Sequence, residues 1–277
     1  MSARAISAYE TALRASVTPV ERAEAHIGLA RVYRTLSDWD AAIREASSAA
    51  RLADEAANGD LAAEAMNVEV GVHQLRGDFV AGERLAQHAL SKAHSPRVRG
   101  ILLQNLGAIA AQRREFSVAE RYFSQSVEAF TAARYEIGIA IALNNASAAA
   151  RDSGDFERSL ELAIVATNVA DRIDALDTTM LALQNQAHAL LELGHVAKAE
   201  SILSQTLGHY AATHNALRYA ECLEIMGRIH EWTPGYIDSA VQCYQLAAAT
   251  AEKVNDRVLV ARLESRLARM GRSANVA

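Results

Sequence analysis

Side-chain amides recur in register along the chain, with Asn105, Asn145 and Asn185 equally spaced. An amide carries both donors and an acceptor, so it can pair with the N–H and the C=O of an extended main chain. Asparagine is an indifferent helix former, so helix propensity does not explain its return. The row predicts either a peptide-binding surface or hydrogen bonds between neighbouring helices. Its members are Asn67, Gln104, Asn105, Asn144, Asn145, Gln184 and Asn185.

Small and charged residues follow the amides one helical turn later. The middle of the chain has Gly71, Ala108 and Ala148 there, which would leave room for a ligand. Towards the two ends this face carries Arg31, Arg34, Arg151, His188 and Arg228, with Glu192, Glu224 and Glu231 as acidic counterparts. Each charged residue is either a ligand contact or part of a solvated helix face.

Motifs of catalysis and metal binding are missing from the sequence. It has no Gly-rich phosphate loop, no G-x-S-x-G and no H-E-x-x-H, which predicts neither an enzyme nor a cofactor. His209 and His214 are five positions apart, a poor helical spacing for two ligands of one metal ion. Cys222 and Cys243 are expected to be reduced core thiols.

Charge and hydropathy restrict the partners and the location. The net charge is −5 without any basic stripe, which argues against nucleic acid as a partner. The first residues have no apolar signal core, and no apolar run is long enough to cross a membrane. These features favour a cytoplasmic protein that does not bind membranes.

A repeat positions the amides. A turn-like pair and an aromatic or apolar residue precede a small residue by three places, as in Gly154-Asp155-Phe156 before Ser159. The small residues fall at 42, 82, 119, 159, 199 and 240. Apolar residues at i, i+3, i+4 and i+7 surround each one, so each unit reads as two helices. The small residue should let the two backbones approach closely, and Trp39, Phe79, Phe116 and Phe156 should pack beneath the turns.

The pattern predicts an all-α solenoid in a single domain spanning residues 1–277. A half-repeat at 3–16 precedes repeats at about 19–57, 60–94, 96–134, 137–173, 177–213 and 216–254, and a capping helix covers 256–270. Thr18, Pro19 and Glu21 form a capping signature at the start of the first repeat. Asp60, Asp177 and Asn255 are further candidate caps.

These residues resemble the tetratricopeptide repeat. The resemblance rests on a glycine or alanine in the first helix (Ala30, Gly107, Ala187, Gly227), the Gly-Asp-aromatic turn and the small residue after it. Its repeats are longer than the usual unit of that family, and in this the chain resembles kinesin light chains, Pins-type adaptors and the sensor arrays of bacterial regulators. The resemblance implies a right-handed superhelix whose first helices line a peptide-binding groove, with asparagines holding the peptide.

Three functions remain open from the sequence. The first is a scaffold whose groove binds an extended segment of another protein. The second is a small-molecule or signal sensor of the bacterial-regulator type, which would need a separate output protein. The third is a structural subunit that assembles through its ends.

The two ends of the array suggest further contacts. In the half-repeat, Ile6, Tyr9 and Leu13 form a stripe that should pack on the next helix and leave an edge for self-association or for a helix of the partner. The last helix should direct its leucines inward and its charged residues outward, as a polar cap does. The leucines are Leu259, Leu263 and Leu267, and the charged residues are Glu264, Arg266 and Arg269.

Overall fold

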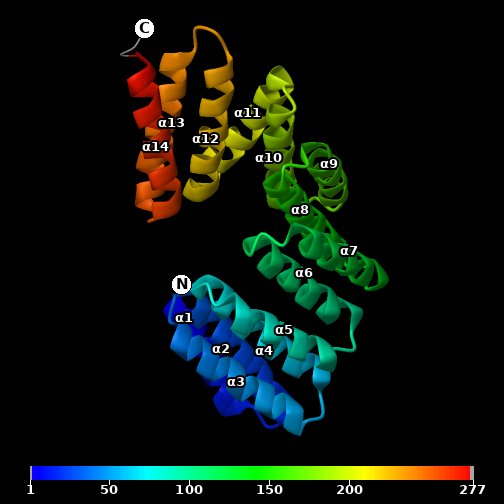
Figure 1. The fold of residues 1–277 in the computed structure, drawn as a ribbon. Coiled ribbons are helices and arrows are strands. Elements are labelled where there is room, and N and C mark those ends of the chain that lie inside the picture. The colour runs from blue at the N-terminus through cyan, green and yellow to red at the C-terminus, as the bar shows by residue number, and fades with distance from the viewer. Residues whose placement is uncertain (1, 275–277) are drawn as a thin grey trace. The chain divides into compact units, whose positions relative to one another are not determined.

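The computed structural model describes residues 2–274, which form fourteen α-helices and no strand (Figure 1). The prediction of an all-α repeat fold is confirmed. None of these helices combines the length and the apolar character needed to cross a membrane. The helices are α1 (Ser2–Ala15), α2 (Pro19–Thr35), α3 (Trp39–Glu55), α4 (Gly59–Arg76), α5 (Phe79–Lys92), α6 (Pro96–Gln112), α7 (Phe116–Ala132), α8 (Glu136–Ser153), α9 (Phe156–Arg172), α10 (Leu176–Glu192), α11 (Val196–Ala212), α12 (Ala216–Trp232), α13 (Ile237–Lys253) and α14 (Arg257–Ala274).

The helices form six hairpins in chain order, α2–α3 to α12–α13, with α1 before them and α14 after them. First helices of successive hairpins also touch each other directly, α2 with α4, α4 with α6, and α10 with α12. The chain divides into two compact units, one through Ala149 and one from Ala150 onward. The division falls within α8 and not in a linker, and each unit is described by itself below.

The periodic small residues lie where helices of one hairpin meet. Ala42, Ala119, Ser159, Ala199 and Ala240 are all fully buried. A matching close contact involves the glycines of the first helices. A Cβ atom on Gly107 would lie 2.7 Å from Cε1 of Phe123, and one on Gly227 would lie 2.6 Å from Cε1 of Tyr244. In these two hairpins the backbone of the first helix therefore touches a ring of the second helix directly.

The predicted turn aromatics are only partly buried. Trp39, Phe79, Phe116 and Phe156 each begin the second helix of a hairpin. Arginines cover two of these rings, with Cζ of Arg76 and Arg114 5.5 and 5.4 Å from the ring centroids of Trp39 and Phe116. The fully buried aromatic rings lie deeper in the hairpins, at Phe123, Phe130 and Tyr244.

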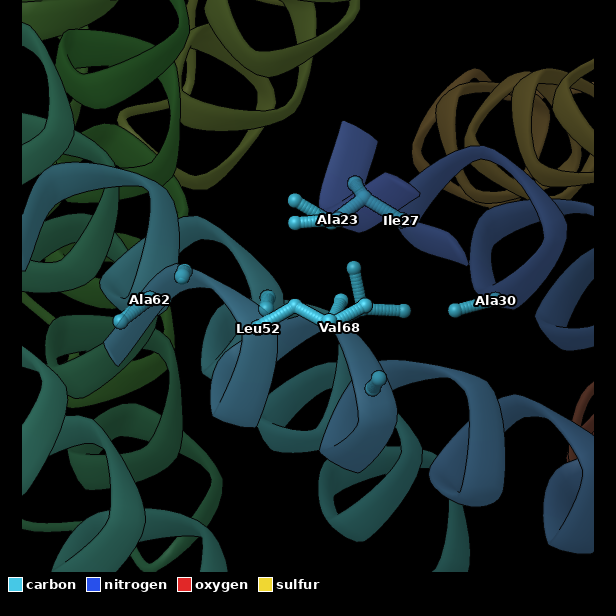
Figure 2. Packing of buried hydrophobic residues seen from close by; sticks show 10 residues of the cluster. Ala23, Ile27, Ala30, Leu52, Ala62 and Val68 are labelled. Atoms are coloured by element: carbon cyan, nitrogen blue, oxygen red, sulfur yellow. The ribbon is translucent and has the colours of Figure 1, made fainter. Parts of the chain in front are cut away.

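The core of the N-terminal unit consists of small and branched side chains. Ala23, Ile27 and Ala30 of α2 pack with Leu52 of α3 and Val68 of α4 (Figure 2). All five are at most 4% exposed. Because alanines dominate this cluster, the helices come close enough for polar side chains on neighbouring helices to bond to each other.

The helix ends confirm one predicted cap and correct three. Thr18 and Glu21 form the capping box of α2. Asn58, not Asp60, caps α4, and Asp60 instead accepts hydrogen bonds from the backbone N–H groups of His94 and Ser95, at 2.7 and 2.9 Å. Asp177 lies inside the first turn of α10 and pairs with His209 at 2.9 Å. Asp256, not Asn255, accepts from the N–H of Leu259 at the start of α14.

Most of the turns contain a residue with positive φ. Glycine occupies this position in four turns, at Gly77, Gly154, Gly194 and Gly235. Non-glycine residues occupy this position in seven other turns, namely Ser37, Ala57, Arg114, Arg134, Asp174, His214 and Asn255. Except at Gly235, which follows the extended C-cap Thr233 of α12, the left-handed residue lies within two positions of the last helical residue and ends the helix, whether or not it is glycine.

The packing of the two terminal helices agrees with the prediction except at Arg266. Tyr9 lies over Gly28 of α2, where an added Cβ would meet its ring at 2.2 Å. In α14, Leu259 and Leu263 are buried and Leu267 packs against them, as predicted. Arg266 does not point outward, because it turns towards the carboxylates of α12.

Candidate functional site

The first helices of the N-terminal unit carry an accessible group of amides. Nδ2 of Asn105 on α6 donates to Oδ1 of Asn67 on α4 at 2.6 Å, which uses one atom of each asparagine amide. Gln74 Nε2 donates to the backbone carbonyl of Asn105 at 3.3 Å. Nδ2 of Asn67 and Oδ1 of Asn105 have no partner among the side chains that the structure describes, those of residues 3–270, and are not sealed from solvent.

Small and polar neighbours extend this surface. Gly71 and Ala108 lie one turn after the asparagines and are only partly buried, as is Gln104. Gln104 makes no side-chain hydrogen bond to another described residue. We call the surface formed by Asn67, Gly71, Gln104, Asn105 and Ala108 the amide face. It offers a donor and an acceptor side by side above small residues.

Two arginines lie beside the amide face on α2. Arg31 pairs with Glu64 of α4 at 3.3 Å. Arg34 is partly buried, and its guanidinium lies across Gly71, where an added Cβ would be 2.7 Å from Nη1. Burial, together with the charge of Arg31, lowers the pKa of Arg34.

Three of the four matching amides of later repeats are buried. Asn144 is buried and Asn145 is partly buried on α8. On α10, Asn185 is 6% exposed, and its Oδ1 accepts from Nη1 of Arg151 at 3.2 Å. Gln184 is 7% exposed, and its Nε2 donates to Glu221 at 3.1 Å. In the C-terminal unit the predicted amides thus join neighbouring helices.

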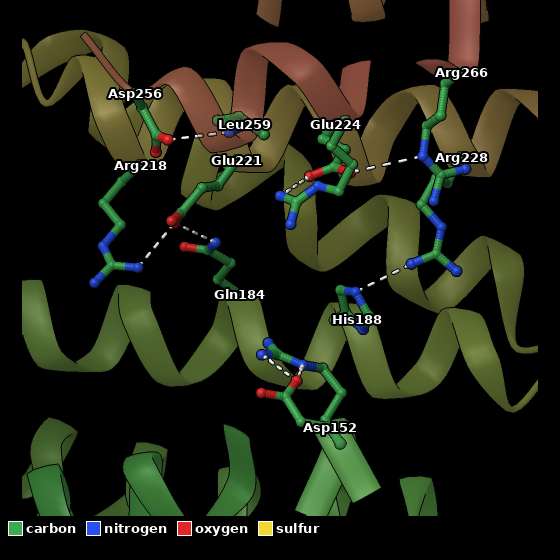
Figure 3. A network of polar contacts seen from close by, with 12 residues as sticks. Asp152, Gln184, His188, Arg218, Glu221, Glu224, Arg228, Asp256, Leu259 and Arg266 are labelled. Atoms are coloured by element: carbon green, nitrogen blue, oxygen red, sulfur yellow. Dashed lines mark hydrogen bonds and ion pairs between the residues drawn. The ribbon is translucent and has the colours of Figure 1, made fainter. Parts of the chain in front are cut away.

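His188 and Arg228 are brought together in the C-terminal unit. Gln184 and His188 project from one side of α10 towards α12 (Figure 3). Nη1 of Arg228 lies 3.0 Å from Nε2 of His188, and the same arginine pairs with Glu192. Since arginine can only donate, Nε2 accepts and the ring proton resides on Nδ1. That buried Nδ1 has no acceptor in the described part of the chain.

Burial keeps His188 neutral. It lowers the pKa of His188 from 6.5 to about 3, and the positive charges of Arg151 and Arg228 act in the same direction. In the unfolded chain the ring gains a proton below about pH 6.5, whereas in the folded chain it stays neutral until about pH 3. Stability should therefore fall as the pH falls through this window.

We expect the free energy of unfolding to drop by about 2 kcal/mol from pH 7 to pH 5 on account of this group alone. His188→Gln keeps an acceptor for Arg228 but does not titrate, so urea unfolding of this variant should depend less on pH. His88→Gln on the exposed surface of α5 is the control and should follow the wild type. Parallel curves for His188→Gln and the wild type would contradict the assignment.

A third group of charges in the C-terminal unit joins α12 to α14. Glu224 is 8% exposed, and its carboxylate lies 2.6 Å from Arg262 Nη2 and 3.6 Å from Arg266 Nε. Arg266 also lies 3.8 Å from Glu231. The acidic residues were visible in the sequence, but their partners on the last helix were not. Both arginines follow Glu224 by roughly one repeat, and that spacing could have indicated them.

The described residues offer little support for a metal site, a reactive cysteine or a deep ligand pocket. No group of three or more His, Cys, Asp or Glu within residues 2–274 could hold a metal ion. Cys222 is buried, which raises its pKa to about 12 and makes it unreactive. A shallow hollow of about 230 Å³ at the α13–α14 turn has Glu252, Asp256 and Glu264 in its lining and no aromatic ring.

The α1 edge exposes little apolar surface. Its exposed residues are mostly alanine and polar types, and Tyr9, 37% exposed, is the large apolar side chain among them. Ile6 and Leu13 are partly buried. The self-association predicted for this edge stays a prediction.

Comparison with known proteins places the fold. No protein-family model matches the sequence, and no match was found among curated proteins. Solved structures do match over most of the chain. The apo form of RapI is 13% identical and has a TM-score of 0.69, with 92% of this chain and 93% of that chain covered. A Rap protein complexed with Competence and Sporulation Factor is 11% identical, with a TM-score of 0.65 over 94% and 78% of the two chains.

The TPR-like repeats of a kinesin light chain from Podosopora anserina are 13% identical, with a TM-score of 0.58 over 72% and 99% of the two chains. This chain has the fold of tetratricopeptide-like repeat proteins. At these identities the likeness concerns the fold alone, so the function of this TPR-like chain has to be argued from its own residues.

Proposed function

We propose that this TPR-like chain is a scaffold that holds an extended segment of another protein against the amide face of its N-terminal unit. The observation that carries the proposal is the Asn67–Asn105 pair. Each amide orients the other, so a donor on α4 and an acceptor on α6 are held in fixed positions. An extended main chain presents an N–H and a C=O that complement such a pair.

The surroundings of the pair suit a main chain better than a bulky side chain. Gly71 and Ala108 add little side-chain bulk beside the two asparagines, and the guanidinium of Arg34 lies across Gly71. Recognition through main-chain atoms depends little on the sequence of the bound segment, which is useful in a scaffold with several partners. The Rap protein solved with Competence and Sporulation Factor supports a binding role for this fold.

The C-terminal unit is a weaker candidate for the same role. Its polar residues at the corresponding positions bond to one another, as in the Arg151–Asn185 and Gln184–Glu221 contacts. A ligand there would have to replace bonds that already exist, and most of the gain would be lost. We therefore propose that Arg151, Gln184, Asn185, His188 and Arg228 mainly fix the packing between repeats.

A double replacement tests the proposed peptide site. Twelve-residue peptides selected on the wild-type protein from a displayed library serve as probes, with affinities measured by fluorescence anisotropy. Asn67→Ala with Asn105→Ala should weaken binding by about 5- to 30-fold, since each lost hydrogen bond is worth about 1 kcal/mol. Peptides N-methylated at alternate residues should lose affinity on the wild-type protein as well.

The control replacement is Asn168→Ala on the exposed surface of α9, which should bind the peptides as the wild type does. Circular dichroism of the double variant establishes whether the helices remain intact. If the folded double variant binds every selected peptide with wild-type affinity, the amide face is not the binding site.

A further inference from the structure

We propose that Asn58 is a site of spontaneous covalent modification, at which the side-chain amide leaves as ammonia and a carboxylate forms. The reacting partner is the backbone nitrogen of Gly59, and the carboxylate of Asp60 controls how often the two groups can meet. This site lies in the turn between α3 and α4 and does not depend on the proposed peptide-binding function.

Asn58 is followed by glycine, the one Asn-Gly pair in the sequence. A Cβ on Gly59 would lie 2.5 Å from the backbone oxygen of Lys92 at the end of α5, so packing disfavours any larger residue there. The N–H of Gly59 begins α4, where a helix offers no acceptor of its own. The nitrogen beside Asn58 is therefore neither shielded by a side chain nor engaged in a helical hydrogen bond.

The reaction balances with water as the only co-reactant. The nitrogen of Gly59 attacks Cγ of Asn58, and the Cγ–Nδ2 bond breaks as Nδ2 takes up the displaced proton and leaves as ammonia. Water then opens the five-membered imide that results. Cleavage of the new bond to Cγ gives aspartate. Cleavage of the bond to the main-chain carbonyl carbon gives isoaspartate, in which the chain continues through Cγ.

The closed turn keeps the reacting atoms apart. Oδ1 of Asn58 accepts from the N–H of Leu61 at 3.1 Å and caps α4. The ψ angle of Asn58 is 87°. Ring closure requires ψ of the opposite sign, which brings the nitrogen of Gly59 to the same side as the Asn58 side chain. The reaction therefore proceeds only while the first turn of α4 is open.

Asp60 holds this turn closed. Its Oδ1 accepts from the backbone N–H groups of His94 and Ser95, at 2.7 and 2.9 Å, in the turn between α5 and α6. Hydrogen bonds to a charged acceptor are stronger than those between neutral groups. These two bonds tie the first turn of α4 to the next hairpin, so the rate of modification should follow how often they break.

The two products differ in their effect on the turn. Aspartate can cap α4 as the amide does, and its charge is favourable at a helix start. Isoaspartate lengthens the main chain by one methylene before Gly59, which already packs against the oxygen of Lys92. The longer chain does not fit the closed turn, so Asp60 should separate from His94.

Mass spectrometry of the full chain, incubated in mildly alkaline buffer with and without urea, tests the assignment. Residues 52–76 form one tryptic peptide that contains both Asn58 and Asn67. We expect Asn58 to be converted and to take up one labelled oxygen from ¹⁸O-water. Asn67, which precedes a valine, should stay intact in the same peptide. Because urea opens the turn, conversion of Asn58 should be at least about tenfold faster in the unfolded chain.

Asp60→Ala should raise the native rate at least about fivefold and leave the rate in urea unchanged, because two hydrogen bonds of the closed turn are lost. Asp60→Asn keeps an acceptor and should raise the native rate less. The matched control is Asp177→Ala, which changes the second residue of α10, as Asp60 is the second of α4, and removes the pair with His209. Its Asn58 should react as in the wild type.

Equal rates in the native and unfolded chains would overturn the proposal, as would conversion of Asn67 ahead of Asn58. A native rate that neither Asp60 variant raises would show that Asp60 does not control the turn. Hydrogen exchange of the separated products completes the test. The amide of His94 should lose protection in the isoaspartate form and keep it in the aspartate form, and equal protection in both would contradict the expected opening of the turn.

Discussion

Replacing Arg262 and Arg266 together with alanine should lower the free energy of unfolding of the C-terminal unit by about 3 kcal/mol. Both guanidinium groups approach the carboxylate of Glu224, which is almost fully buried on α12. Removing them leaves a buried charge without compensation, which costs more than the loss of an exposed ion pair. Because repeats depend on their neighbours, the loss should be local.

Hydrogen exchange with mass spectrometry is the appropriate measurement. Amides of α13 and α14 should lose protection first, while α2 to α5 should exchange as before. Adding Glu224→Met to the double variant removes the buried charge and should restore most of the stability. If the triple variant is no more stable than the double variant, the ion pairs with Glu224 are not what holds α14 in place.

Gly107→Ala should lower the free energy of unfolding by about 1–2 kcal/mol, although alanine favours helix. Its Cβ would lie 2.7 Å from the ring of Phe123, which is 1% exposed, so the ring or the helix must shift. Gly208→Ala on α11 is the matched control. No atom lies within 4 Å of the added Cβ there, so this variant should gain about 1 kcal/mol from helix propensity.

Urea unfolding of the two glycine variants and the wild type measures both changes in the free energy of unfolding in one experiment. Opposite shifts would show that ring-to-backbone contact determines the spacing of the α6–α7 hairpin. Two stabilising shifts would show instead that the contact relaxes easily.

The repeat was predictable because its small residues obey a strict packing requirement. Ala119 and Ala240 are fully buried where two helices cross, and a larger side chain at either place would separate the hairpin. Such a requirement recurs in every hairpin and is therefore visible as a period. The helix bounds follow from the same register, as at α2, which starts at Pro19 as the capping signature predicts.

The partners of polar side chains were not predictable in the same way. Asn67 and Asn105 were recognisable as members of one row of amides, but their hydrogen bond depends on the approach of α4 to α6. Asp60 reads as a helix cap from its neighbours in sequence, yet it bonds to backbone groups 34 and 35 residues away. Long side chains have many rotamers, and one repeat pattern is compatible with several networks. The peptide-binding role of the predicted residues stays a prediction.

Several turns between the helices lower the free energy of unfolding of this chain because of the residue types they contain. Seven of them hold a non-glycine residue at positive φ, such as Arg114 at 62° and Arg134 at 52°. A side chain makes that conformation less favourable by about 1 kcal/mol than glycine would, and asparagine is the most tolerant exception. Glycine substitutions at these turns should therefore raise the free energy of unfolding without altering any helix face. The array could lose some stability to mutations on the amide face and recover it at these turns, which lie outside that face.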